Sequence, residues 1–61
     1  MSIETELHIF EDGNRIAKVF TRGKGSYRVW MYDSYLETEK ENNFDDEQSA
    51  EDCAENWVLN K

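Results

Sequence analysis

The absence of an internal cross-link most limits what this chain can fold into. Its 61 residues contain one cysteine, Cys53, and one histidine, His8. They cannot form an intramolecular disulfide or supply a Cys/His zinc set. A chain of this length buries only about 60% of its unfolded surface, and such chains usually need a disulfide, a metal or a partner. We therefore expect one domain, residues 1–61, that binds a protein partner or forms a homodimer.

Acidic residues dominate the second half of the chain. The sequence has 7 basic and 14 acidic residues, a formal net charge of -7. Residues 1–32 hold five bases and four acids, net +1, whereas residues 33–61 hold two bases and ten acids, net -8. Nucleic acids and anionic lipids attract cationic surfaces, so we expect no direct nucleic-acid binding.

Several features predict a cytoplasmic location. The N-terminal residues, Met1 to Glu6, lack the basic and apolar regions of a secretory signal. No apolar run approaches the roughly 20 residues needed to span a bilayer, so no membrane association is expected. One unpaired cysteine suits a reducing compartment.

Turn signals divide the first two thirds of the chain into β-prone runs. Glu11–Asn14 and Thr21–Ser26 contain glycine among polar residues, and Asp33-Ser34 reads as a tight turn. Aromatic and β-branched residues between these turns favour strands. The predicted strands cover about residues 5–11, 15–21, 26–32 and 35–41. Consecutive hairpins of this kind form a meander.

The C-terminal third has helical periodicity instead. Apolar residues recur at the spacing of one helix face. They are Ala50, Cys53, Ala54, Trp57 and Val58. Asp45 is a suitable N-cap, with Gln48 three residues later as in a capping box. The helix is predicted over about residues 46–59. The predicted fold class is α+β, a three- or four-stranded antiparallel β-meander with one C-terminal helix packed on one face.

Strand alternation sorts the side chains onto two faces of the sheet. If the turns preserve odd-with-odd pairing, the first face carries Leu7, Ile9, Ala17, Val19, Tyr27, Val29 and Met31, with Leu36 and Thr38 added by the last turn. The second face carries His8, Phe10, Ile16, Lys18, Phe20, Arg28, Trp30 and Tyr32. The helix stripe fits the first face, although it could instead cover the second.

One helix cannot cover both faces, so an apolar face is left over. Aromatic residues and arginine are enriched at the centres of protein interfaces, and exposed apolar patches usually mark an interaction surface. The alternative is that cross-strand pairing and basic side chains cover this face. The expected register places Arg28 opposite Glu39 and Lys18 near Trp30. The predicted partner-binding residues are Phe10, Ile16, Phe20, Arg28, Trp30 and Tyr32.

Motifs of catalysis and cofactor binding do not emerge from the sequence. Thr21–Ser26 has the glycines and lysine of a phosphate loop, but a strand follows where such a loop needs a helix. His8 has no serine or cysteine at a recognisable partner spacing, and Cys53 lies on the apolar helix stripe. We therefore expect no catalytic, cofactor-binding or metal site and no enzyme activity.

The acids around the helix allow two interpretations. The residues concerned are Asp45, Asp46, Glu51, Asp52 and Glu55. They lack the spacing of a calcium-binding EF-hand loop. They either form a solvated, capped helix face, or imitate a row of phosphates and occupy a DNA- or RNA-binding protein.

The order of these segments also suggests a family. The β-rich stretch from Gly13 to Tyr32, then Phe44–Glu47, then a helix ending Ala54–Leu59, resembles the short acidic accessory proteins of tailed bacteriophages, notably T4-like phages of marine cyanobacteria. The resemblance covers most of the chain and implies a protein of the host cytoplasm that binds and redirects a host protein. It carries no active-site residue across. The sequence thus predicts a non-enzymatic interaction module, with nucleic-acid mimicry as the alternative.

Overall fold

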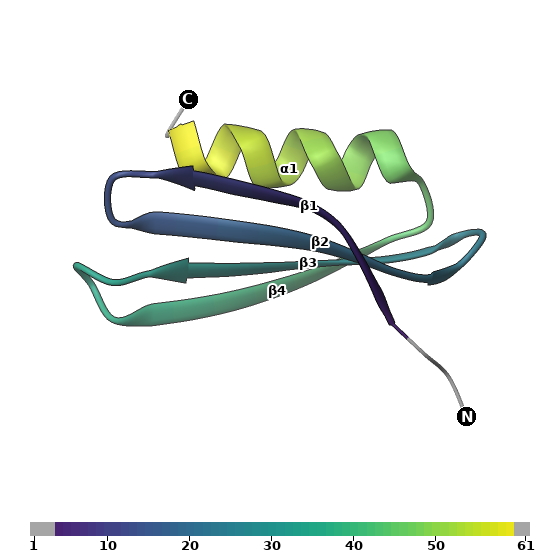
Figure 1. Cartoon of the computed structure of the whole chain (residues 1–61), viewed down its shortest axis with the longest axis horizontal. Coiled ribbons are helices and arrows are strands. Elements are labelled where there is room, and N and C mark those ends of the chain that lie inside the picture. The colour runs from purple at the N-terminus through teal and green to yellow at the C-terminus, as the bar shows by residue number, and fades with distance from the viewer. Residues whose placement is uncertain (1–3, 60–61) are drawn as a thin grey trace.

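Four antiparallel strands and one helix make up the fold. The computed structural model describes residues 4–59. Its elements are β1 (Thr5–Asp12), β2 (Arg15–Gly23), β3 (Ser26–Asp33), β4 (Thr38–Phe44) and α1 (Glu47–Leu59). The strands pair in the order β1-β2-β3-β4, and α1 lies across one face of the sheet (Figure 1). The predicted α+β class, a meander followed by a packed helix, is confirmed.

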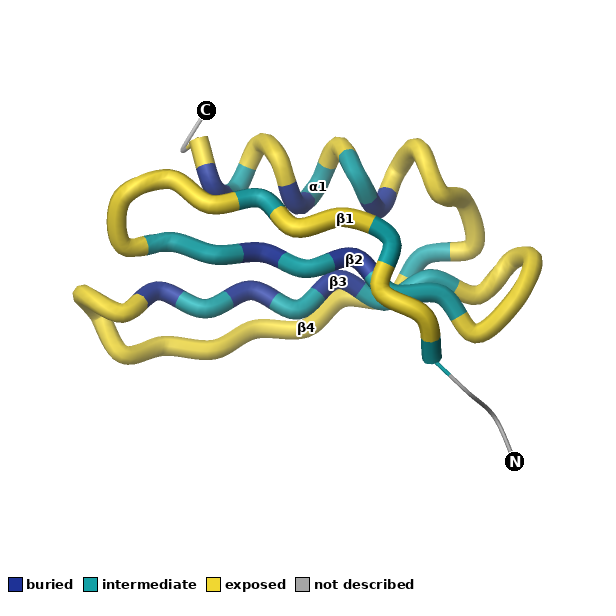
Figure 2. The backbone as a smooth tube through the Cα atoms, viewed as in Figure 1, coloured by how far each residue is buried: buried dark blue, intermediate teal, exposed yellow. Residues whose placement is uncertain are grey.

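The core lies between α1 and the two central strands. Small and aliphatic side chains interlock there: Ala17, Val19, Val29 and Met31 from the sheet, and Ala50, Ala54 and Val58 from α1. Half-buried Cys53 and Trp57 pack beside them, so the predicted helix stripe is correct. The buried positions of α1 all face the sheet in Figure 2. The helix therefore covers the face that carries Val19, Val29 and Met31, and leaves uncovered the face that carries Phe20, Trp30 and Tyr32.

The helix begins at Glu47, one residue later than predicted, and its N-cap is displaced by one residue as well. The Asp46 carboxylate, not that of Asp45, accepts hydrogen bonds from the backbone N–H and the hydroxyl of Ser49, at 2.9 and 3.0 Å. Asp46 is thus the N-cap and Ser49 the third helical residue. Gln48 instead donates to Asp52 one helical turn further on.

Within residues 4–59, no helix is both long and apolar enough to cross a membrane.

A β-bulge in β1 reverses the predicted orientation of the side chains that follow it. The pairing with β2 shifts between Glu6 and His8, so one extra residue is accommodated in β1. After the bulge, Phe10 pairs with Ala17 and packs against the core, although it was predicted on the uncovered face. Ile9 moves the opposite way and is 50% exposed. A one-residue shift reverses every following side chain because the strand repeat is two residues.

The fourth strand begins three residues later than predicted. A turn spans residues 34–37, with Glu37 in the left-handed region at φ 53°. Thr38 therefore pairs with Asp33, and Arg28 lies opposite Asn43. The predicted Arg28–Glu39 pairing is wrong, because the longer turn changes the register of β4. Leu36, predicted on the covered face, lies in the turn and is 58% exposed.

Candidate interaction surface

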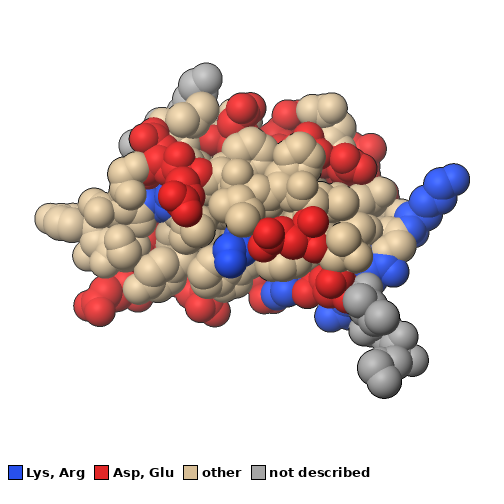
Figure 3. All heavy atoms as spheres, in the orientation of Figure 1, with Lys and Arg blue, Asp and Glu red and all other residues tan. Residues whose placement is uncertain are grey.

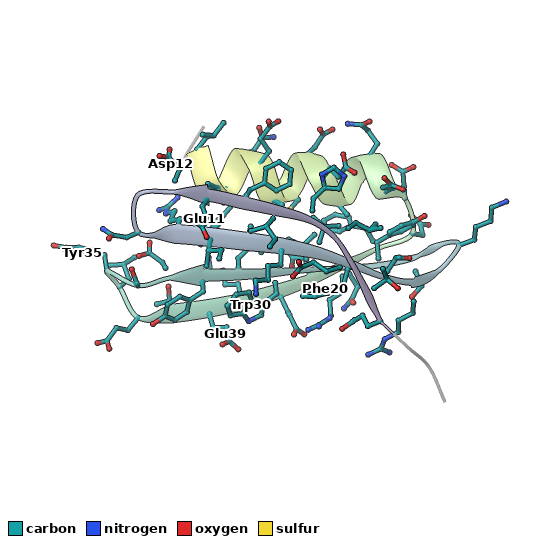
Figure 4. All side chains as sticks on the ribbon, viewed as in Figure 1. Glu11, Asp12, Phe20, Trp30, Tyr35 and Glu39 are labelled. Carbon is teal, nitrogen blue, oxygen red and sulfur yellow. The ribbon has the colours of Figure 1, made fainter. Side chains whose placement is uncertain are left out.

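The side of the sheet turned away from α1 carries three large aromatic residues, Phe20, Trp30 and Tyr32. Because Ala17, Val19, Val29 and Met31 point into the core, their strand neighbours point the other way. We call this surface the open face. Its apolar and basic side chains are Ile9, Ile16, Lys18, Phe20, Arg28, Trp30 and Tyr32. Figure 4 labels Phe20 and Trp30 among the strands, away from the helix.

Stacking holds the centre of the open face in place. The Trp30 and Tyr32 rings stack with centroids 6.0 Å apart and an interplanar angle of 2°. The Lys18 ammonium lies 5.7 Å from the centroid of Trp30, as the sequence predicted, and the Arg28 guanidinium lies 4.8 Å from that of Phe20. These cation–π contacts leave the rings half-buried. The open face thus carries an ordered aromatic layer, in which Trp30 contacts Tyr32 and Lys18, and Phe20 contacts Arg28.

A group of ion pairs lies at one end of this aromatic layer. Arg28 donates from Nε and Nη2 to the Glu4 carboxylate at 2.8 and 2.6 Å, and it also bonds Glu41. Arg22 lies 3.5 Å from Glu4. The hydrogen bond from Arg28 lowers the pKa of Glu4. The matching bond to Glu4 raises the pKa of Arg28. The positive charge of Arg28 is therefore largely neutralised within the chain.

Two shallow hollows adjoin on the open face. The first, of about 290 Å³, is lined by Lys18, Phe20, Arg28, Trp30 and Glu41. The second, of about 250 Å³, shares three of these residues and is lined by Glu4, Phe20, Arg22, Ser26, Arg28, Glu41 and Asn43. An aromatic floor with charged walls suits a protruding side chain of a partner protein.

The structure brings five of the six predicted partner-binding residues onto one surface. They are Ile16, Phe20, Arg28, Trp30 and Tyr32. Phe10 does not join them, because the bulge places it on the helix side. Ile9 takes its place, and sequence reasoning missed it because nothing in the local sequence reveals where the extra residue lies.

The turn between β3 and β4 presents a second apolar feature that the sequence did not predict. Tyr35 is 79% exposed and projects from the end of the molecule (Figure 4). The buried Asp33 carboxylate accepts hydrogen bonds from the N–H groups of Tyr35 and Leu36, at 2.9 and 3.1 Å. These bonds, led by that from Leu36 and joined by Arg15, lower the pKa of Asp33. The turn therefore holds two exposed apolar side chains on a fixed backbone.

The predicted acidic residues do not form one uniform surface. Asp46 caps the helix, Asp52 accepts a hydrogen bond from Gln48, and Glu51 lies 3.1 Å from His8 of β1. Asp45 and Glu55 are exposed. Acidic atoms gather over α1 in Figure 3, whereas basic atoms gather at the end that holds the turn between β2 and β3. Part of the acidic run thus has local structural roles.

A group of potential metal ligands lies beside the first turns of the helix. The sequence predicts no metal site, because one cysteine and one histidine cannot supply a Cys/His set. The fold brings His8 together with Glu47 and Glu51, with one ligand atom from each within 4.8 Å of the others. Burial, and next the neighbouring Glu47 carboxyl, raise the pKa of Glu51. Two acids and an imidazole therefore converge at one place.

Comparison of the chain with protein-family models, curated proteins and solved structures finds no match.

Proposed function

We propose that this protein is a non-enzymatic interaction module that binds a partner protein through its open face. The observation that carries the proposal is the ordered aromatic layer around Trp30, on the side of the sheet that no helix of residues 4–59 covers. The resemblance to phage accessory proteins suggests a host protein as the partner. A second copy of the chain is the other candidate.

Preorganisation supports binding through this layer. Immobilising a free side chain at an interface costs about 0.5–1.5 kcal/mol, and this cost falls when the side chain is already ordered. Trp30 is held between Tyr32 and Lys18 before any partner arrives. Phe20 is held under Arg28 in the same way. Tryptophan, tyrosine and arginine are also the residues most enriched at interface hot spots.

The two edge strands of the sheet are poorly suited to pairing with another chain. This favours the open face as the contact surface. β4 is an exposed edge strand with consecutive charged residues, Glu39, Lys40 and Glu41. The other edge, β1, contains the bulge. Charged side chains and bulges both discourage edge-to-edge strand pairing. Contact through the open face requires no new strand pairing.

A single substitution on the open face tests the proposal. We expect Trp30→Ala to retain the circular dichroism spectrum while weakening association by about 2 kcal/mol or more, which is roughly 30-fold. Sedimentation equilibrium measures self-association. Capture from a bacterial host lysate, followed by titration of the purified partner, measures binding to another protein.

Tyr35→Ala is the matched control, because it removes an exposed aromatic ring from the turn instead of the open face. Its binding should equal that of the unmodified protein. Loss of binding in Tyr35→Ala alone would place the contact at the turn and contradict the proposal. A monomer at all concentrations that captures no protein through Trp30 would also contradict it.

Mimicry of nucleic acid is the second candidate, favoured by the charge of α1. The helix carries four acids and no basic residue over Glu47–Leu59. Binding by mimicry should weaken steeply with salt and respond to Glu55→Gln, because it depends on charge. Apolar binding through the open face should depend little on salt. Measuring affinity across a salt series separates the two.

A further inference from the structure

We infer that His8, Glu47 and Glu51 form a binding site for a divalent transition-metal ion of the Zn²⁺ type, joining β1 to the start of α1. The three side chains come from segments about 40 residues apart in sequence. This inference is independent of the open face, which lies on the other side of the sheet.

The bulge in β1 orients the His8 side chain towards the helix. Because the register shifts between Glu6 and His8, His8 pairs with Val19, whose side chain lies in the core under α1. Without the extra residue, His8 would fall on the open face, as the sequence pattern predicts. Bulges commonly redirect a side chain in this way at functional positions.

The helix supplies the two oxygen ligands. Glu47 and Glu51 are four residues apart, so they lie on the same side of α1 on successive turns. The Glu51 Oε2 atom is 3.1 Å from His8 Nε2. Around a tetrahedral ion with bonds of about 2.0–2.1 Å, neighbouring ligand atoms are about 3.3 Å apart. The His8–Glu51 pair already has nearly this separation.

The Glu47 carboxylate needs only a small adjustment to complete the set. All three ligand atoms lie within 4.8 Å of one another. His8 and Glu47 are exposed, so side-chain rotation can close the remaining distance, and water can occupy the fourth position. Three protein ligands with one open position is the arrangement of many zinc sites.

The donor types select the class of ion. A neutral imidazole nitrogen suits zinc and other first-row transition metals, whereas Mg²⁺ and Ca²⁺ prefer oxygen ligands alone. Two carboxylates beside one imidazole leave excess negative charge near Glu51, with Asp52 adding to it. A divalent cation neutralises that charge.

Titration with Zn²⁺, and with Co²⁺ as a spectroscopic probe, tests the site in the full chain. We expect one ion per chain, a rise in Tm with Zn²⁺ concentration, and a shift of the His8 imidazole NMR signals. His8→Gln should weaken binding by about tenfold or more, and Glu47→Gln should weaken it similarly and reduce the shift of the His8 imidazole signals. Mg²⁺ should not compete.

Two controls guard against other binding sites. Glu55→Gln removes a helix acid outside the cluster, and Cys53→Ser removes the thiol; both should bind Zn²⁺ as the unmodified protein does. Equal affinity in His8→Gln and the unmodified protein would show non-specific carboxylate binding and overturn the inference. Absence of any Tm or NMR response to Zn²⁺ would also overturn it.

Discussion

Arg15 contacts the C-terminal end of the helix at Trp57, through both the indole ring and the backbone carbonyl. Its guanidinium lies 5.0 Å from the centroid of the Trp57 ring, and its Nη1 donates to the Trp57 carbonyl oxygen at 2.7 Å. Its Nε donates to Asp33 at 3.1 Å. A cation at a helix C-terminus satisfies carbonyls that have no partner within the helix and interacts favourably with the helix dipole. One side chain thus ties β2, β3 and the helix end together.

Removing Arg15 should therefore destabilise the whole fold. Arg15→Ala deletes the helix-end contact and leaves the buried Asp33 carboxylate without its cationic partner. Lys24→Ala is the control, because it removes the same charge from an exposed turn. Thermal denaturation followed by circular dichroism should show a clearly lower Tm for Arg15→Ala and little change for Lys24→Ala. Equal Tm values for both variants would mean that Arg15 has no structural role.

Acid should destabilise the protein through Asp33 and Glu4. Hydrogen bonds hold both carboxyl pKa values below their ordinary values of 3.8 and 4.5. A group with a lowered pKa in the folded state binds fewer protons there than in the unfolded state. Its stabilising contribution is present above the unfolded pKa and is lost as pH falls through the folded pKa. We expect the free energy of unfolding to fall below about pH 4.

The Asp33 contribution can be isolated with the Asp33→Asn variant. Its stability should be lower near neutral pH and should decline less between pH 5 and pH 3 than that of the unmodified protein. Urea denaturation at each pH measures both values. Parallel pH profiles for the two proteins would show that Asp33 does not contribute to the acid response.

Neighbouring residues in β3 should respond very differently to truncation. Met31 is 2% exposed and lies in the core, so Met31→Ala should lower the free energy of unfolding by about 2–5 kcal/mol. Trp30 points to the open face, and Trp30→Ala should lose only about 1 kcal/mol from stacking and the contact with Lys18. Chemical denaturation gives both values. The reverse ranking would mean that the helix covers the other face of the sheet.

The spacing of apolar residues and the glycine-containing turns were sufficient to predict the helix and strands of this fold. The glycine-containing turns marked two hairpins, and the spacing of Ala50, Ala54 and Val58 identified the helix and its buried side. The same alternation correctly placed Trp30 and Phe20 on one face. These signals are local, because they depend on residues within one strand or one turn.

Register depends instead on pairing between strands, and there the sequence was insufficient. Asp33-Ser34 looked like a two-residue turn, but the Asp33 carboxylate supports a longer one that delays β4 by three residues. The bulge before His8 likewise depends on how β1 meets β2 and α1. The cluster of His8 with Glu47 and Glu51 follows from that bulge, so no spacing in the sequence could have indicated it.

The bulge itself is testable with two neighbouring residues whose predicted and observed positions are opposite. Alternation without a bulge buries Ile9 and exposes Phe10, whereas the structure packs Phe10 against the core and leaves Ile9 50% exposed. We therefore expect Phe10→Ala to lower the free energy of unfolding by about 1–3 kcal/mol, because a half-buried ring is lost. Ile9→Ala should change it by less than about 0.5 kcal/mol, as for other exposed positions. Urea denaturation of both variants measures the difference, and a larger loss for Ile9→Ala would place the bulge elsewhere and remove His8 from the helix side.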